Sequence, residues 1–123
     1  MLPTGLYCPD TTQTFRRKTR TIQIGNVKVG SDHPIVKQTM TTSDTRDVDA
    51  TVNEIMRCAD AGAEMVRITV QGMQEAKACQ EIKNKLLQSG YTTPIIADIH
   101  FAPKVAMTVA DCLDKIRINP GNF

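Results

Sequence analysis

Four short apolar runs, each ending in polar residues, are separated by stretches with helical periodicity. The runs cover residues 35–40, 65–70, 94–100 and 115–120. Strands that alternate with helices form right-handed βαβ units and therefore a parallel sheet. Parallel strands are usually covered on both faces and read as nearly unbroken apolar runs, as these do. The pattern therefore predicts an α/β fold with four parallel strands.

Apolar residues recur at helical spacing between the predicted strands. Gly62 and Gly90 stand where the first two helices would end, and Pro103 opens the third as a favoured first-turn residue. The three predicted apolar stripes are Val48, Val52, Ile55, Met56 and Ala59; Met73, Ala76, Cys79, Ile82 and Leu86; and Val105, Ala106, Val109, Ala110 and Leu113.

The segment before the first strand has a different pattern. Residues 20–30 alternate between apolar and polar on both sides of Gly25-Asn26, which predicts a β-hairpin because glycine supplies the positive φ of the turn. Such a hairpin would cap one end of a barrel. Residues 1–15 show no periodicity and are expected to form an irregular N-terminal segment.

Four strand–helix steps, the last without its helix, amount to half of an eight-stranded TIM barrel. We therefore predict that residues 16–123 form the N-terminal half of a TIM (β/α)8 barrel, preceded by the β-hairpin. A doubly wound sheet of four strands is an alternative, although the glycine-rich phosphate fingerprint that such sheets often carry is absent.

Polar residues within these strands point to a site. Alternate residues of a strand share a face, and a simple assignment places one set against the helices: Val66, Ile68, Val70, Ile95, Ala97, Ile99, Ile116 and Ile118. The opposite set then converges at the barrel mouth: Arg67, Thr69, Asp98, His100, Arg117 and Asn119. Two guanidinium groups suit a phosphate or diphosphate. A carboxylate and an imidazole beside them would pair with the arginines, bind a substrate hydroxyl or move a proton.

Structural interpretations explain the same residues. An Asp–Arg pair inside a barrel can be an ion network without chemistry, and His100 can be a structural residue. Residues 119–122 are all turn formers. The hydroxyl-rich residues 38–42 are compatible with substrate binding and equally with capping the next helix.

Composition narrows the class of protein. The net charge of +2 gives no sign of a nucleic-acid binder, and the basic residues 16–20 are either a solvated segment or a phosphate-facing patch. No apolar run approaches the roughly 20 residues that span a bilayer. Cys8, Cys58, Cys79 and Cys112 match no metal or disulfide spacing, so we expect no metal site and a reducing compartment.

Several segments together resemble the 4-hydroxy-3-methylbut-2-enyl diphosphate synthases of the non-mevalonate isoprenoid pathway. The similarity covers nearly all of residues 16–123, and two motifs look most like the plant and chlamydial form, which carries an extra middle domain. The matching segments are RRKTR (16–20), IGNV (24–27), PI (34–35), QTMTTSDT (38–45), GAEMVRITV (62–70), ADIHFAP (97–103) and KIRINPGNF (115–123).

The resemblance implies a TIM barrel that binds 2-C-methyl-D-erythritol 2,4-cyclodiphosphate. It further implies an oxidoreductase with a [4Fe-4S] cluster in a separate C-terminal domain, electrons from ferredoxin or flavodoxin, and a homodimer as one assembly. By motif match, Arg67, Arg117 and Asn119 would hold the diphosphate, while Asp98 and His100 would be the catalytic residues of the same pocket. A bacterial cytoplasm or a plastid stroma is the expected location.

This sequence departs from the family pattern in its extent. It lacks the later barrel strands and the iron–sulfur domain, and none of its four cysteines matches a cluster ligand. We therefore expect the chain alone to be inactive. Two other functions remain open: a non-catalytic phosphate-ligand binding half-barrel or assembly module, and another TIM-barrel enzyme such as a pterin-binding transferase.

Overall fold

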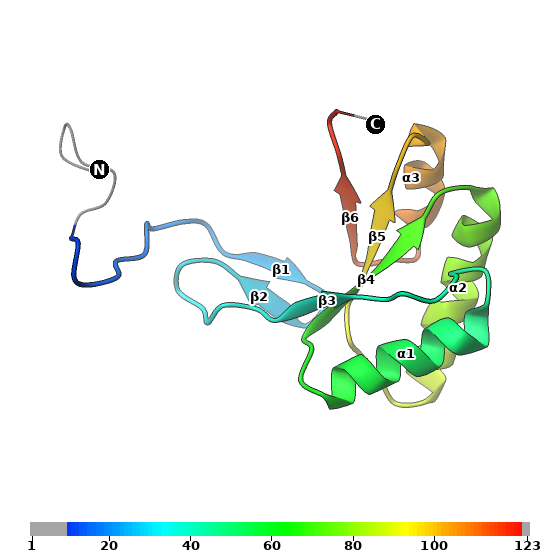
Figure 1. The fold of residues 1–123 in the computed structure, drawn as a ribbon, viewed down its shortest axis with the longest axis horizontal. Helices are drawn as coiled ribbons and strands as arrows, with labels where there is room; N and C mark the ends of the chain where they lie inside the picture. The colour runs from blue at the N-terminus through cyan, green and yellow to red at the C-terminus, as the bar shows by residue number, and fades with distance from the viewer. Residues whose placement is uncertain (1–9, 122–123) are drawn as a thin grey trace.

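The computed structural model describes residues 10–121 and confirms the α/β fold class, with six strands and three helices in that range (Figure 1). They are β1 (Ile22–Ile24), β2 (Val27–Val29), β3 (Gln38–Met40), α1 (Val48–Asp60), β4 (Met65–Val70), α2 (Met73–Gln88), β5 (Ile95–Ile99), α3 (Pro103–Val109) and β6 (Lys115–Ile118). Residues 10–15 contain no helix or strand, and residues 1–9 of the predicted irregular segment lie outside the described residues.

The four later strands form one parallel sheet in the order β3-β4-β5-β6, while β1 and β2 pair as an antiparallel hairpin. Consecutive parallel neighbours joined by single helices are the arrangement of a TIM barrel. The predicted N-terminal half-barrel with its preceding hairpin is therefore confirmed. None of the helices among residues 10–121 is long and apolar enough to cross a membrane.

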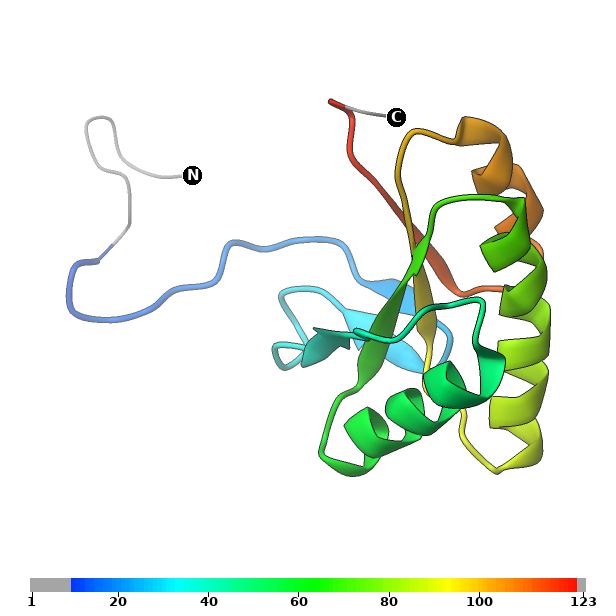
Figure 2. The ribbon, with the colours of Figure 1, turned by 45° about the vertical axis from the view of Figure 1, so that its right-hand side comes forward.

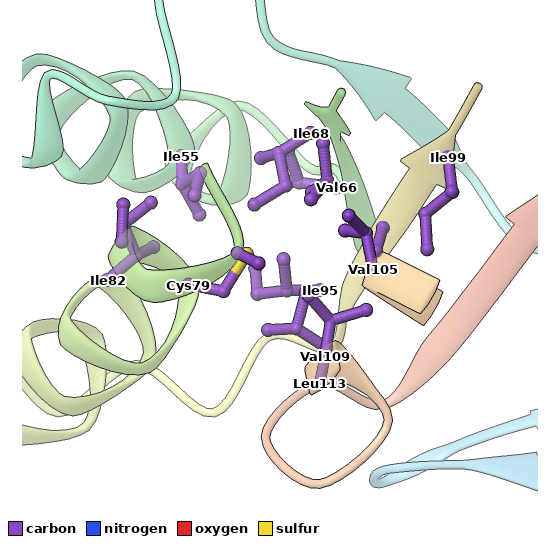
Figure 3. Close-up of a cluster of buried hydrophobic side chains, with 14 of the residues drawn as sticks. Ile55, Val66, Ile68, Cys79, Ile82, Ile95, Ile99, Val105, Val109 and Leu113 are labelled. Carbon is purple, nitrogen blue, oxygen red and sulfur yellow. The ribbon is translucent and has the colours of Figure 1, made fainter. Parts of the chain in front are cut away.

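The three helices cover one face of this sheet (Figure 2). Val66, Ile68 and Val70 of β4, and Ile95, Ala97 and Ile99 of β5, point into this layer and are fully buried, as the alternation predicted. Figure 3 shows several of them meeting Ile55 of α1, Cys79 and Ile82 of α2, and Val105 and Val109 of α3. Each large apolar side chain buried in this way stabilises the fold by about 1.5–3 kcal/mol.

The helix boundaries follow local chemistry. The Asp47 side chain accepts a hydrogen bond from the amide of Ala50 (3.2 Å) and caps the start of α1. Gly62 and Gly90 have positive φ values just after α1 and α2, as predicted. The third stripe was predicted too long: α3 ends at Val109, whose carbonyl accepts bonds from the amides of both Cys112 and Leu113.

The hairpin covers the other face of the sheet near the N-terminal ends of β4 and β5. Ile24 packs with Met65 and Ile96, the inward-facing residues nearest the start of β4 and β5. The hairpin turn is also tied to the loop before β5, because Asn26 Nδ2 donates to Thr92 Oγ1 (3.2 Å). This end of the half-barrel is therefore closed by the hairpin, as the sequence predicted.

The edge strands depart most from prediction. Of the apolar run 35–40, only Gln38–Met40 forms a strand, and the Ile35 side chain is 83% exposed. At the opposite edge, Ile118 was expected to face the helices but is exposed. Both strands have a sheet neighbour on one side only within residues 10–121, so their apolar residues receive less cover than those of β4 and β5.

Candidate functional site

A buried carboxylate on β5 gathers three basic side chains on the inner face of the sheet. Asp98 Oδ1 lies 3.0 Å from Arg117 Nη1 and 3.2 Å from His100 Nε2, and Asp98 Oδ2 lies 3.5 Å from Arg67 Nε. We refer to these four residues as the Asp98 cluster. The predicted convergence of Arg67, Asp98, His100 and Arg117 is thus confirmed, and its geometry is that of an ion network.

Strand register explains the convergence. Asp98 stands beside Thr69 of β4 and Arg117 of β6. Arg67 lies one inward-facing position earlier on β4, and His100 follows the last residue of β5 on the same face as Asp98. The central strand therefore supplies the carboxylate, and the two neighbouring strands supply one guanidinium each.

The charges of the cluster do not balance. Two guanidinium groups face one carboxylate whose side chain is only 4% exposed, while the side chains of Arg67 and Arg117 are 29% and 37% exposed. Burying Asp98 alone would be costly, and the arginines offset that cost. Since one carboxylate neutralises only one guanidinium, a net positive charge remains on the accessible side of the cluster.

Arg67 has donors that the rest of the protein uses poorly. Its Nη2 contacts Met40 Sδ at 3.4 Å, which is a weak acceptor. Its Nε is buried, and no atom of residues 10–121 accepts a well-aligned hydrogen bond from it. Because the Arg67 side chain stays 29% exposed, the surplus charge of its guanidinium is suited to an oxygen-rich anion.

A cavity of about 330 Å³ adjoins the cluster, lined by Gln71, His100 and Phe101. Gln71 follows β4 and Phe101 follows β5 by two positions, so the cavity lies at the carboxyl ends of the strands, where barrel enzymes hold their ligands. The sequence analysis did not identify Gln71 or Phe101. Gln71 lies in no motif, and Phe101 stands in the ADIHFAP segment without an assigned role, because the position of both residues at the cavity depends on where the strands end.

Two predicted site residues make other contacts. The Asn119 side chain accepts a hydrogen bond from the amide of Gly121 (3.0 Å), as the turn interpretation of this segment expects. The Thr69 carbonyl accepts a hydrogen bond from Thr45 Oγ1 (2.7 Å), which attaches the loop after β3 to β4.

The loop after β3 is held by a carboxylate of α1. Glu54 Oε1 accepts hydrogen bonds from the Thr42 amide (2.7 Å) and hydroxyl (3.1 Å), and Glu54 Oε2 accepts one from the Ser43 amide (3.0 Å). Partial burial raises the pKa of Glu54, but these hydrogen bonds outweigh it and leave the pKa below the ordinary value of 4.5. The hydroxyl-rich loop is therefore anchored at the mouth of the half-barrel by its own helix.

Comparison with known proteins identifies the family. The sequence model of the GcpE TIM-barrel domain matches residues 19–123. The chain belongs to this family. A TIM-barrel domain agrees with the parallel strands and helices seen in Figure 1.

Three relatives of the GcpE chain carry the same enzyme name. This chain is 63% identical over 123 residues to the chloroplastic, ferredoxin-type 4-hydroxy-3-methylbut-2-en-1-yl diphosphate synthase of Oryza sativa subsp. japonica. The match covers all of this chain and 16% of that protein. The Arabidopsis thaliana counterpart is 62% identical over the same length, 17% of its own. The flavodoxin-type synthase of Protochlamydia amoebophila is 56% identical over 117 residues, 95% of this chain and 18% of that protein. The GcpE chain thus spans about a sixth of the length of the curated relatives it matches.

The cysteines within residues 10–121 are not arranged to hold an iron–sulfur cluster. Cys58, Cys79 and Cys112 are free, and no group of three or more His, Cys, Asp or Glu residues within 10–121 is placed to hold a metal ion. Burial, with smaller contributions from Cys112 and Glu75, raises the pKa of the Cys79 thiol to about 12. Cys79 is fully buried in the apolar core and is therefore a packing residue. Cys8 lies outside the described residues.

Proposed function

We propose that this chain is the substrate-binding first half of the barrel of a 4-hydroxy-3-methylbut-2-enyl diphosphate synthase, acting in isoprenoid biosynthesis. Its ligand would be 2-C-methyl-D-erythritol 2,4-cyclodiphosphate. One observation carries the proposal: Arg67 and Arg117 converge on Asp98 at the carboxyl side of the sheet and retain a net positive charge. A diphosphate is the kind of ligand that this charge and these donors suit.

Each residue of the site has a role in this proposal. Arg67 and Arg117 donate to the diphosphate oxygens, and Asn119 adds an amide donor if its side chain leaves the turn. Asp98 fixes the separation of the two guanidinium groups through both of its oxygens. His100, which also lines the cavity, would contact a substrate hydroxyl or phosphate oxygen and transfer a proton.

The proposed reaction divides between this chain and the rest of the enzyme. Two electrons and one proton would open the cyclic diphosphate and release the C3 hydroxyl as water. The described residues do not fit the [4Fe-4S] group of such enzymes, so the contribution of this chain is to bind and orient the ligand and to handle protons. We therefore expect no turnover from this chain alone with substrate and reduced ferredoxin.

The setting of the protein is part of the proposal. The relatives are named for ferredoxin or flavodoxin, and the plant proteins are chloroplastic. We propose one of these electron donors as a partner and a plastid or a bacterial cytoplasm as the location. We also propose that residues 16–123 form the barrel segment and that a separate iron–sulfur domain complements it. The proposed assembly is a homodimer.

Ligand titration tests this function. Calorimetry with the cyclodiphosphate would compare the native protein, at the length it has in its source cells, with Arg67→Ala, Arg117→Ala and the control Arg57→Ala on the exposed side of α1. We expect each site variant to bind at least about tenfold more weakly, since a charged hydrogen bond contributes about 1.5–3 kcal/mol. Unchanged affinity together with a collapsed melting temperature would instead identify a purely structural ion network.

A further inference from the structure

Phe101 has a backbone conformation that its residue type disfavours. Its φ is 57°, and it is the one non-glycine residue with positive φ within residues 10–121. The Cβ atom makes this left-handed region unfavourable, and residues held there cluster at functional sites. The strain occurs directly after His100, at the carboxyl end of β5.

Burial does not explain this strain. The Phe101 side chain is 76% exposed, and its ring centroid lies 6.4 Å from that of His100 with the planes tilted by 39°. A large exposed aromatic side chain on a strained backbone contributes little to the core. Its packing on the imidazole holds the ring at the rim of the cavity that Gln71 and His100 also line.

The cavity lies directly above the Asp98 cluster. Val70 pairs with Ile99, so the next position along each strand places Gln71 level with His100. Both residues belong to the inward set that contains Arg67 and Asp98. The cluster therefore offers cationic donors below, and Phe101 offers an apolar surface at the rim above.

We propose that Phe101 is a ligand-contacting residue that packs against the carbon skeleton of a phosphorylated ligand whose phosphates lie on Arg67 and Arg117. The identity of that ligand as the methyl-bearing cyclodiphosphate rests on the proposed function. The placement of an aromatic ring beside the basic cluster does not, because His100 lines the cavity with Phe101 and also pairs with Asp98, which lies between the two arginines.

The decisive experiment separates the anionic part of the ligand from its carbon part. Calorimetry on the native protein would use inorganic diphosphate, dimethylallyl diphosphate, which adds an apolar chain to the same anion, and the cyclodiphosphate. Phe101→Gly removes the ring and suits the left-handed backbone, whereas Phe101→Leu keeps an apolar side chain. Met107→Ala is the matched control, because Met107 is an apolar residue of α3 with a similar exposure of 77%.

We expect Phe101→Gly to weaken binding of both organic diphosphates by about three- to tenfold, the range of an aromatic contact. Its affinity for inorganic diphosphate should not change, and its melting temperature should be equal or higher because the backbone strain is relieved. Phe101→Leu should lie between Phe101→Gly and the native protein, and Met107→Ala should match the native protein with all three ligands.

Three results would overturn the proposal: equal losses for all three ligands, no loss for any of them, or organic diphosphates that bind the native protein no better than inorganic diphosphate. Failure of the proposed function looks different. The cyclodiphosphate would then not bind the native protein, while dimethylallyl diphosphate would still distinguish Phe101→Gly from the native protein.

Discussion

The inner face of the half-barrel has two ends of opposite character. At the hairpin end, Met65 and Ile96 are buried beneath Ile24. Two residues further along the same strands, Arg67 and Asp98 form an ion network at the mouth end. Because a strand repeats every two residues, neighbouring positions on one face can be apolar at one end and ionic at the other.

The difference shows how this fold separates stability from ligand binding. The hairpin covers the apolar end and contributes to the core, while the mouth end stays accessible and holds surplus positive charge. Substitutions at the hairpin end should therefore change mainly the free energy of unfolding. Substitutions at the mouth end should change ligand affinity as well, and this contrast can be tested one residue at a time.

The largest effect is expected at the hairpin end. Ile96→Ala would leave a cavity between the hairpin and β5, so we expect the free energy of unfolding to fall by about 3–4 kcal/mol. Urea denaturation of the native protein measures this loss. Ile35→Ala is the matched control, since Ile35 is exposed and should change stability by less than about 0.5 kcal/mol. Equal losses of stability for Ile96→Ala and Ile35→Ala would contradict the packing of the hairpin on Ile96.

At the mouth end, Asp98→Asn should destabilise the protein by about 2 kcal/mol. The amide keeps the shape but leaves Arg67 and Arg117 without a counter-charge, and their partial exposure reduces the loss below that of a fully buried pair. Added sodium chloride should recover part of the loss by screening the two like charges. The exposed Asp111→Asn is the control, and a salt-independent loss would argue against the charge imbalance.

The contrast between central and edge strands also explains what the sequence could predict. The bounds of β4 were predicted correctly as 65–70. The faces of β4 and β5 followed from alternation, because each of these strands has a neighbouring strand on both sides. The same alternation was wrong for Ile118, and the run at 35–40 was predicted too long. Apolar content does not reveal that a strand lies at an edge, because that property depends on neighbours far away in the chain.

The site was predictable to a similar degree and for a related reason. Period two places Arg67, Asp98 and Arg117 on one face, but only the register shows that Asp98 bridges both arginines. The place of Phe101 at the rim was not predicted, since nothing about phenylalanine predicts a positive φ. The sequence pattern therefore identifies the residues of the Asp98 cluster. The rim of the adjoining cavity depends on the backbone conformation after the end of β5.

A smaller effect is expected at the hairpin turn. Gly25 has a φ of 57°, and a Cβ added there would lie 3.0 Å from Pro94 Cγ. Gly25→Ala should cost about 1–2 kcal/mol from the left-handed backbone and should also loosen the hairpin from the sheet. Faster hydrogen exchange at β1 and β2 amides would report the loosening. Gly90→Ala has positive φ but open space, so it should lower stability without changing hairpin exchange.

The smallest effect belongs to the loop at the mouth and depends on pH. Hydrogen bonds from Thr42 and Ser43 hold the pKa of Glu54 below 4.5, so its contribution to stability is present above that pH and is lost as the pH falls through the lowered pKa. Glu54→Gln cannot accept all three bonds and should cost about 1 kcal/mol at pH 7. Urea denaturation between pH 7 and pH 3 should show this difference shrinking, because the native carboxylate becomes protonated while the amide does not titrate. A difference that stays constant down to pH 3 would mean that packing, not the carboxylate charge, anchors this loop.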